Sequence, residues 1–413
     1  MKLSRIYSVL FFSVCFLVFF LVRCISKKET EADPRGQSYV GAEKCRQCHR
    51  DIYDTYVMSN HFYASSPATK KSIAGSFNPG NNTFNFSSLL KIVMEERDSG
   101  LYQVAYQGAK QTEAHRFDVT FGRRHAQTFL SWNKNEPYEL PISYYTSIKG
   151  WATSPGYSPH DIDFSRFIST DCFECHSSFI KTELNGFSQE LDKNSLVYGI
   201  DCERCHGPAI NHVNYHEAYP DVKKAKYIVS NNSLTRQQKL DRCSVCHSGN
   251  DKTKVISRFE FKPGDTLAKF LYPDESKNSS AFDVHGNQYQ LLSQSACFLG
   301  SKTLDCSSCH NPHSNSSSNL KEFSKKCISC HQNPNHETLN KQQKIINKIT
   351  DNCIDCHMPQ QPSSAITFNL EGNTEKNAYL LRTHKIAIYK QDRGIVKSFI
   401  SYFNKNKSEN DKF

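Results

Sequence analysis

Seven short cysteine patterns constrain this chain of 413 residues more than any other feature. Each pattern has two cysteines separated by two residues, followed directly by a histidine. The copies are Cys45-Cys48-His49, Cys172-Cys175-His176, Cys202-Cys205-His206, Cys243-Cys246-His247, Cys306-Cys309-His310, Cys327-Cys330-His331 and Cys353-Cys356-His357. Two thiols at this spacing can each form a thioether to one porphyrin vinyl group, and the adjacent histidine then reaches the iron. The patterns therefore predict seven covalently attached c-type haems.

Structural zinc is the main alternative for these cysteines. Cys306, Cys309, Cys327 and Cys330 have the spacing of a four-cysteine zinc site. Histidine, however, makes up only 17 of 413 residues. Its occurrence after all seven cysteine pairs by chance has a probability of about 10^-10, whereas haem attachment requires it. The histidines therefore favour haem over zinc.

Three cysteines remain outside the seven motifs. Cys15 and Cys24 lie in or at the end of an N-terminal apolar segment, which leaves Cys297 alone in the rest of the chain. A framework of disulfides is therefore not expected. We expect Cys297 to be a small buried apolar residue, with haem ligation as the alternative.

Composition and charge are also explained by haem. Hydrophobic residues are 38% of the chain, which is low for a globular protein of this length, so covalently fixed macrocycles would supply much of the core. The formal charge of +10 alone would suggest a nucleic-acid partner. Seven haems would add about fourteen propionate charges, which cancel that excess. We therefore expect no nucleic-acid partner.

The N-terminus predicts export. Residues 1–25 have a short basic start, a nearly unbroken apolar run over 6–22, and Arg23-Cys24 at its end, which is typical of a signal or a membrane anchor. Haem attachment takes place outside the cytoplasm, so export agrees with the motifs. We expect the protein on the periplasmic side of a bacterial membrane, held there by this segment or by a lipid on Cys24.

The remaining sequence predicts a linker and one large haem domain. Residues 26–37 are polar and of mixed charge, and 38–413 form the predicted heptahaem domain, densest in haem over 165–390. Alternating apolar residues predict a β-meander insertion at about 75–135, and 137–159 has the composition of an irregular connector. With about 31 residues for each motif after Cys172, the predicted fold class is mainly α with much irregular loop.

Several segments resemble the bacterial multihaem cytochromes c. They are Tyr39-Val-Gly-Ala-Glu-Lys-Cys45, the stretch from Cys202 through Gly207-Pro208 to His212, His285-Gly-Asn-Gln288, Cys306 to His313, and Cys353 to Pro359. The nearest named group is the tetrahaem cytochrome family that accepts electrons from hydroxylamine oxidoreductase. The resemblance implies periplasmic electron transfer through haems with mostly two histidine ligands. The seven motifs depart from that family, and the resemblance does not identify the donor or the acceptor.

Ten histidines outside the motifs are candidates for the distal iron ligands. His313 follows His310 by three residues, a reach of at most about 10 Å, so it cannot pass round its own porphyrin and would bind a neighbouring haem. His212, six residues after His206, is similarly constrained. The predicted distal ligands are His61, His160, His212, His285, His313, His336 and His384, with His125 in reserve.

Two functions are consistent with this set of residues. The favoured one is an electron carrier, with redox proteins or quinol-linked membrane enzymes as partners and no catalytic residues of its own. The alternative is an oxidoreductase that acts on a small nitrogen or sulfur oxyanion at one five-coordinate haem. No C-x-x-C-K motif marks such a site, and there are enough histidines to fill every distal position, so the sequence favours the carrier and leaves the enzyme open.

Overall fold

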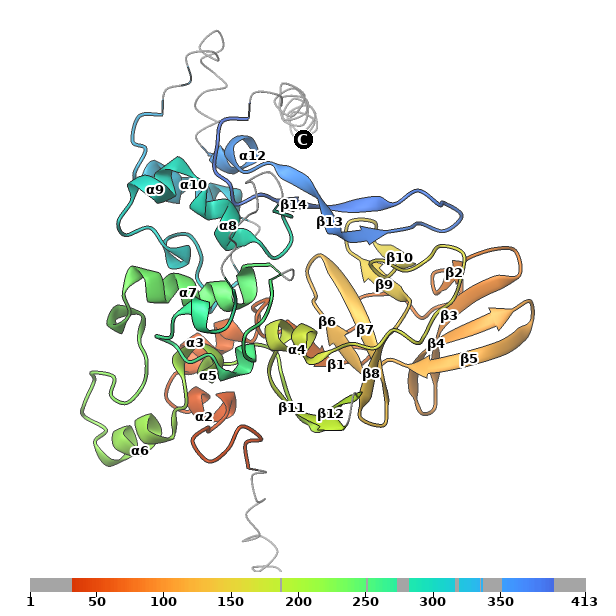
Figure 1. The fold of residues 1–413 in the computed structure, drawn as a ribbon, viewed down its shortest axis with the longest axis horizontal. Helices are drawn as coiled ribbons and strands as arrows, with labels where there is room; N and C mark the ends of the chain where they lie inside the picture. The colour runs from red at the N-terminus through yellow and green to blue at the C-terminus, as the bar shows by residue number, and fades with distance from the viewer. Residues whose placement is uncertain are drawn as a thin grey trace, which may run out of the picture.

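The computed structural model describes residues 32–185, 188–249, 252–272, 282–315, 319–334, 336 and 351–389. Two lobes are visible in Figure 1, a helical one and one built of strands. We call residues 64–168 the β lobe and the rest of the described chain the haem lobe. The prediction of a mainly α fold was wrong, because the described chain contains a six-stranded sheet, a four-stranded sheet and two separate hairpins. Helices in the spacers are short, and paired strands take up much of the remaining length.

The β lobe is a pair of packed antiparallel sheets. The smaller sheet is the predicted meander, β2 (Thr83–Asn85), β3 (Leu90–Arg97), β4 (Gly100–Gln107) and β5 (Lys110–Arg116). The larger one contains β1 (Ser65–Pro67), β6 (Val119–Phe121), β7 (Ala126–Asn133), β8 (Glu136–Glu139), β9 (Ile142–Tyr145) and β10 (Gly150–Thr153). Ile92, Met94, Phe129 and Ile142 are fully buried between the sheets. Residues 137–159 are therefore not an irregular connector, because β8, β9 and β10 lie there.

The haem lobe consists of short helices. They are α2 (Ala42–Arg46), α3 (Arg50–Tyr56), α4 (Thr170–His176), α5 (Cys202–His206), α6 (Ile210–Ala218), η1 (Asn231–Ser233), α7 (Arg236–His247), η2 (Arg258–Glu260), η3 (Leu267–Lys269), α8 (Gln288–Ser293), α9 (Ala296–Gly300), η4 (Cys306–Ser308), α10 (Leu320–Ile328) and α12 (Cys353–His357). The longest has 12 residues. Isolated helices of this length are marginal in water, so their stability must come from what they pack against.

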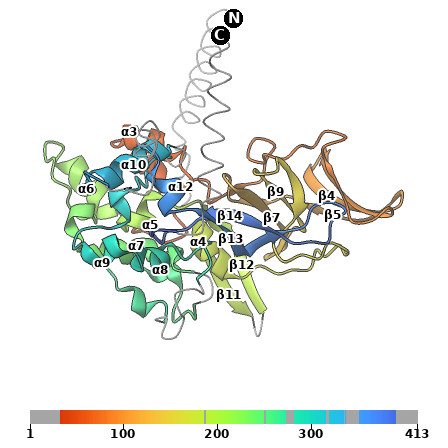
Figure 2. The ribbon, with the colours of Figure 1, turned by 90° about the horizontal axis from the view of Figure 1, so that it is seen from above.

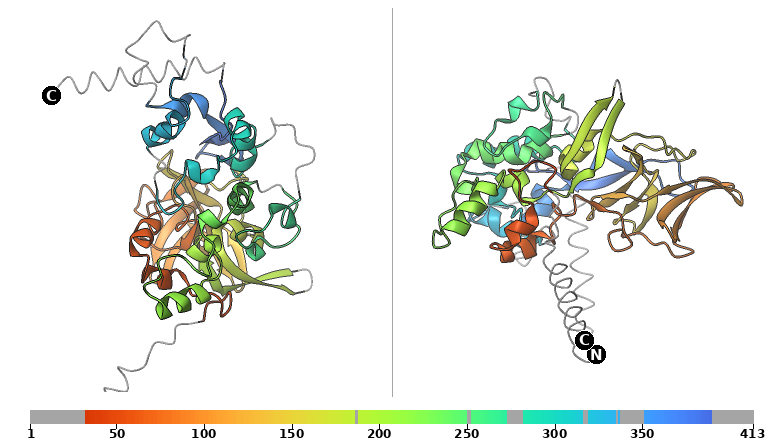
Figure 3. Two further views of the ribbon diagram at one scale, coloured as in Figure 1. Left: turned by 90° about the vertical axis from the view of Figure 1, so that its left-hand side faces the viewer. Right: turned by 90° about the horizontal axis from the view of Figure 1, so that it is seen from below.

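Two hairpins join the lobes. The hairpin of β11 (Ser177–Asn185) and β12 (Ser188–Tyr198) directly follows α4 and packs with it on the face of the large sheet turned away from the meander, through Phe173, Ile180 and Leu191. The hairpin of β13 (Gln360–Phe368) and β14 (Asn377–Arg382) leaves α12 and crosses to β9 and β10, as Figures 1 and 2 show. In the right-hand view of Figure 3 the blue hairpin β13–β14 again runs between the helices and the strands of the β lobe.

Residues 1–31 lie outside the described chain, so the predicted signal or anchor and the start of the linker are not described. No helix among the described residues is long and apolar enough to span a bilayer.

Candidate haem-binding site

Each C-x-x-C-H motif occupies one turn of helix. The backbone N–H of the motif histidine donates to the carbonyl of the first cysteine at 2.9 Å in the motifs of His49, His310 and His331. An i to i−4 bond of this kind places the first cysteine and the histidine on one face. Asp201, Asp305 and Asn352, each directly before a motif, accept a backbone N–H as N-caps. Local sequence thus fixes the conformation that a porphyrin edge requires.

The motifs line one continuous cavity of 3650 Å³. All fourteen motif cysteines and fifteen of the seventeen histidines lie in its wall, and the two histidines outside it are His115 and His160. Protein interiors are close-packed, so polypeptide alone does not leave an interior space of this size. Divided among seven motifs, 3650/7 gives about 520 Å³ each, within the range of about 300–1,000 Å³ that is usual for a site holding one small molecule or cofactor.

Histidines face each other in pairs across this cavity. Their ring centroids are 6.3 Å apart for His49 and His212, 6.3 Å for His247 and His61, 5.9 Å for His206 and His313, 6.1 Å for His310 and His384, and 6.3 Å for His357 and His336. An imidazole nitrogen binds a first-row metal at about 2 Å and its ring centre lies about 1.1 Å behind, so two imidazoles on opposite sides of one iron have centroids about 6.2 Å apart. The measured separations match that geometry.

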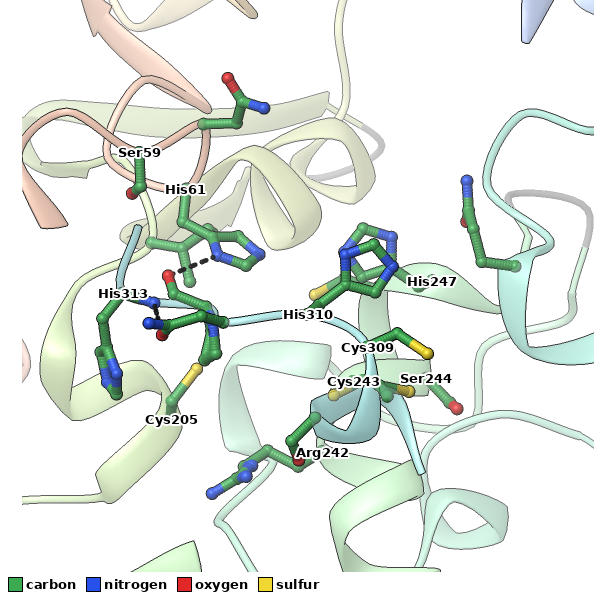
Figure 4. A pocket seen from close by; sticks show the side chains of 18 of the residues that line it. Ser59, His61, Cys205, Arg242, Cys243, Ser244, His247, Cys309, His310 and His313 are labelled. Carbon is green, nitrogen blue, oxygen red and sulfur yellow. Dashed lines mark hydrogen bonds between the residues drawn. The ribbon is translucent and has the colours of Figure 1, made fainter. Parts of the chain in front are cut away.

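Backbone carbonyls hold several of these rings in the form that binds metal. Nδ1 lies 2.8 Å from the Val229 carbonyl in His206 and 2.7 Å from the Lys226 carbonyl in His212. In His357 the carbonyl is that of Ala387, at 2.9 Å. A carbonyl only accepts, so Nδ1 carries the hydrogen and Nε2 keeps its lone pair for the iron. Figure 4 shows His61 with its bond to a backbone carbonyl, which is that of Pro312, and its ring on the side of His247.

Burial keeps the paired rings neutral. It lowers the pKa of His247 to about 4, with the nearby His61 adding to the effect. Burial likewise lowers the pKa of His384 to about 4, with a contribution from His310. Only a neutral imidazole offers a lone pair, so these rings are ready to bind metal at neutral pH.

His176, the histidine of the second motif, also has another histidine near it. The charge of His285 acts on it and lowers its pKa further than burial does alone, so the two rings share one part of the cavity. Nδ1 of His176 lies 3.3 Å from the Ala64 carbonyl. His125 lies near His285, and its Nδ1 is within hydrogen-bond distance of the Tyr379 hydroxyl, at 3.3 Å. Six of the seven distal ligands predicted from sequence thus lie near a motif histidine.

His160 is the predicted ligand that the structure does not bring to the cavity. It is exposed on the β lobe, where its backbone N–H donates to the Ser158 hydroxyl at 3.1 Å. The loop belongs to the Phe164 side of the sheet pair, away from every motif. The composition of 137–159 predicts a connector that leads to Cys172, whereas this segment forms strands of the β lobe and keeps the following His160 on that lobe.

Comparisons with known proteins agree with this site. A sequence model of the family described as cytochrome c554 and c-prime matches residues 119–207, which include two of the motifs. The crystal structure of the outer cell wall cytochrome OcwA superimposes with a TM-score of 0.53 at 16% identity, and the match covers 85% of this chain and 80% of that one. No curated protein matches the sequence.

The family match and the structural likeness both support a multihaem c-type cytochrome, in agreement with the seven attachment motifs. The family match covers less than half of the chain and the structural likeness reports on the fold, so the narrower resemblance to the tetrahaem partner of hydroxylamine oxidoreductase is not shown. Haem c bound covalently is the cofactor that this class implies. The paired histidines and the cavity of this chain fit that group.

Motifs far apart in the sequence touch through their thiols. The contact between Cys45 and Cys202 lowers the pKa of the first thiol and raises that of the second. The same kind of contact joins Cys175 to Cys246, Cys243 to Cys306, and Cys327 to Cys353. These contacts bring the first motif to the third, the fourth to the second and fifth, and the sixth to the seventh.

Local histidines tie the same motifs together. His212 follows the third motif and faces the first, His313 follows the fifth and faces the third, and His61 follows the first and faces the fourth. His313 therefore faces a neighbouring motif, as its short distance from His310 requires. Cys309 also lies near enough to Cys330 for their charges to interact, which brings the fifth motif to the sixth. All seven motifs thus form one connected array.

Buried carboxylates within the motifs fasten this array. Glu203, between the cysteines of the third motif, accepts from the Arg35 guanidinium at 3.2 Å and from the backbone N–H groups of Gly41 and Ala209, both at 2.9 Å. Glu174 of the second motif accepts from Ser257 at 2.6 Å and pairs with Arg258 at 3.3 Å. These roles were not predicted from the sequence. An acidic residue between the two cysteines of a motif was the available signal.

Proposed function

We propose that this cytochrome carries electrons between redox partners through seven covalently attached haems, six of them held between two histidines. The observation that supports this most is the set of five histidine pairs with centroids 5.9 to 6.3 Å apart across one cavity. Filling both axial positions with imidazole leaves no site for a substrate and suits transfer of electrons alone.

The chain supplies the ligands and the order of the array. In the proposed assignment, His212, His285, His313, His61, His384 and His336 are the distal ligands opposite His49, His176, His206, His247, His310 and His357. Haem iron supplies one-electron oxidation and reduction. The thiol contacts and the crossed histidines keep neighbouring sites close, which supports passage along the whole molecule.

The location and the partners are also part of the proposal. The basic and apolar start of the sequence favours export and retention at the periplasmic side of a bacterial membrane, by an anchor or by a lipid on Cys24. Redox proteins or quinol-linked membrane enzymes would then be within reach as donors and acceptors.

Intact mass and electron paramagnetic resonance test the proposal. We expect the mass of seven haems on the chain, and low-spin signals from the six paired sites. His384→Ala removes one distal imidazole, so one additional haem should become high-spin and bind carbon monoxide when reduced. His115→Ala is the matched control, because His115 stacks on Phe164 in the β lobe and should leave every haem unchanged. Fewer than seven haems, or an unchanged spectrum in a folded His384→Ala protein, would contradict the proposal.

A further inference from the structure

Every histidine of the sequence is among the described residues, so each can be placed. Ten form the five measured pairs, and His176 and His285 lie close enough for their charges to interact. His115 and His160 lie outside the cavity, and His125 is beside Tyr379. The ring of His216 is tilted against that of His212, with centroids 4.7 Å apart. The seventeenth is His331, the motif histidine of the sixth site. Among the described residues, which include all seventeen histidines, no ring faces it at the distance that the five measured pairs share.

The sixth motif lies at the rim of the array. Both Cys330 and His331 are exposed, and Cys330 is one of only two exposed cysteines in the described chain, with Cys48 as the other. His336, the next histidine along the chain, is engaged with His357 of the seventh motif at 6.3 Å. A ligand from solvent can therefore reach this site without crossing the interior.

The helix that leads into the sixth motif carries positive charge toward the cavity. Lys326, directly before Cys327 on α10, lines the cavity, and its charge acts on the Cys309 thiol against the effect of burial. Within the described part of the chain Lys326 makes no ion pair. Its neighbour Lys325 is neutralised by Glu322 at 2.6 Å and does not line the cavity. An anion near His331 would therefore meet an uncompensated cation.

We propose that the haem held by Cys327, Cys330 and His331 keeps an open position opposite His331 and binds small anions there. The proposal rests on the proposed function, because it takes seven attached haems as given, and it adds a ligand-binding site to an electron carrier. Two of its cysteines place this site next to other motifs of the array. Cys327 contacts Cys353 of the seventh motif, and Cys330 lies near Cys309 of the fifth. A small inorganic anion bound here is thus placed where electrons can reach it.

Azide is a suitable probe, because it is a small anion at neutral pH and binds ferric haem. The oxidised cytochrome should show one high-spin haem of seven, and azide should convert that one to low spin with a stoichiometry of one per chain. In the reduced protein, carbon monoxide should bind one haem. His336→Ala opens the seventh site as well, so azide should then bind two haems.

Charge variants place the binding site. Lys326→Gln should weaken azide binding by up to about fivefold, which is the effect of one unit charge acting over a few Å in water, and leave the affinity for neutral carbon monoxide unchanged. Lys325→Gln should alter neither. A protein with seven haems, all low-spin and unreactive to azide, overturns the open site and leaves the proposed function standing, whereas a mass of fewer than seven haems contradicts the proposed function itself.

Cys297 provides the remaining control. Its charge acts on both Cys309 and Cys327, so it is a thiol within reach of this part of the array. In Cys297→Ala, azide binding should be the same as in the parent cytochrome. If azide binds only after this substitution, a thiolate fills the position opposite His331 and the proposal is wrong.

Discussion

The two lobes are built around different kinds of core. In the β lobe, side chains from two sheets fill the interior, and Ile92, Met94, Phe129 and Ile142 are inaccessible to solvent. Among the helices of the haem lobe the corresponding space is a cavity of 3650 Å³ whose wall includes all fourteen motif cysteines. The β lobe therefore owes its stability to its own sequence. The side chains of the haem lobe surround the cavity, and the lobe depends on the cofactor to fill it.

Removal of haem is the change that should separate the lobes most. Helices of five to twelve residues around a cavity of this size cannot hold together alone, so the haem lobe of chain expressed without haem attachment should be unfolded. The β lobe should keep its sheets. Hydrogen exchange resolved by peptide would show slow exchange over β3, β4 and β7 and fast exchange over α5, α7 and α12.

Slow exchange in those helices without haem would mean that the haem lobe has a polypeptide core after all. Fast exchange throughout would mean that the β lobe needs the hairpins β11–β12 and β13–β14 to be docked by a folded haem lobe. The first result would contradict the dependence of the haem lobe on haem, and the second would contradict the independent stability of the β lobe.

The same difference explains what sequence could predict. The attachment motifs and the candidate distal histidines could be predicted from the sequence because the chemistry of haem demands fixed residue types. Six of the seven predicted distal ligands line the cavity. The β lobe was only partly visible. The meander at β2 to β5 alternates clearly, but β8, β9 and β10 are four residues each and are interrupted by Pro137, Pro141 and Gly150. The fold class was wrong because the stretch between the first and second motifs forms two sheets where one meander was predicted, and further hairpins follow the second and seventh motifs.

A large-to-small substitution in the core of the β lobe should destabilise that lobe and leave the environment of the haems unchanged. Phe129 is fully buried between the sheets and packs edge-on against Phe117, with ring centroids 4.8 Å apart. Phe129→Ala should cost about 3–5 kcal/mol. Denaturation followed by tryptophan fluorescence should report it, since Trp151 packs 5.8 Å from Phe129. The haem absorption spectrum in native buffer should not change, and a shifted spectrum would show that the lobes are not independent.

Removing a buried carboxylate should test whether Glu203 holds the segment around Gly41 against the third motif. Glu203→Ala leaves the backbone N–H groups of Gly41 and Ala209 without their acceptor, at a cost of about 2 kcal/mol. Arg35 keeps its ion pairs with Asp33 and Asp201, both at 2.8 Å, so no buried charge is left unpaired. The residues around Gly41 should exchange faster, while exchange in the β lobe stays the same. Glu183→Gln is the control, because its ion pair with Lys181 at 2.6 Å is on the exposed part of β11 and its loss should not be measurable. Equal effects of the two substitutions would refute a fastening role for Glu203.

The smallest expected effect concerns the start of α7, the helix that carries the fourth motif. The Thr235 side chain accepts from the Gln238 backbone N–H, and the Gln238 side chain reciprocates in a capping box. Thr235→Ala removes this cap, at a cost of about 1 kcal/mol. Two thioethers and a ligand at the other end of α7 should confine the loss to the first turn, so exchange should rise at Gln237 and Gln238 and not at Val245. Thr235→Ser keeps the hydroxyl and should restore slow exchange. If Val245 also exchanges faster in Thr235→Ala, the haem does not dominate the stability of α7, and the haem lobe resembles the β lobe more than its cavity suggests.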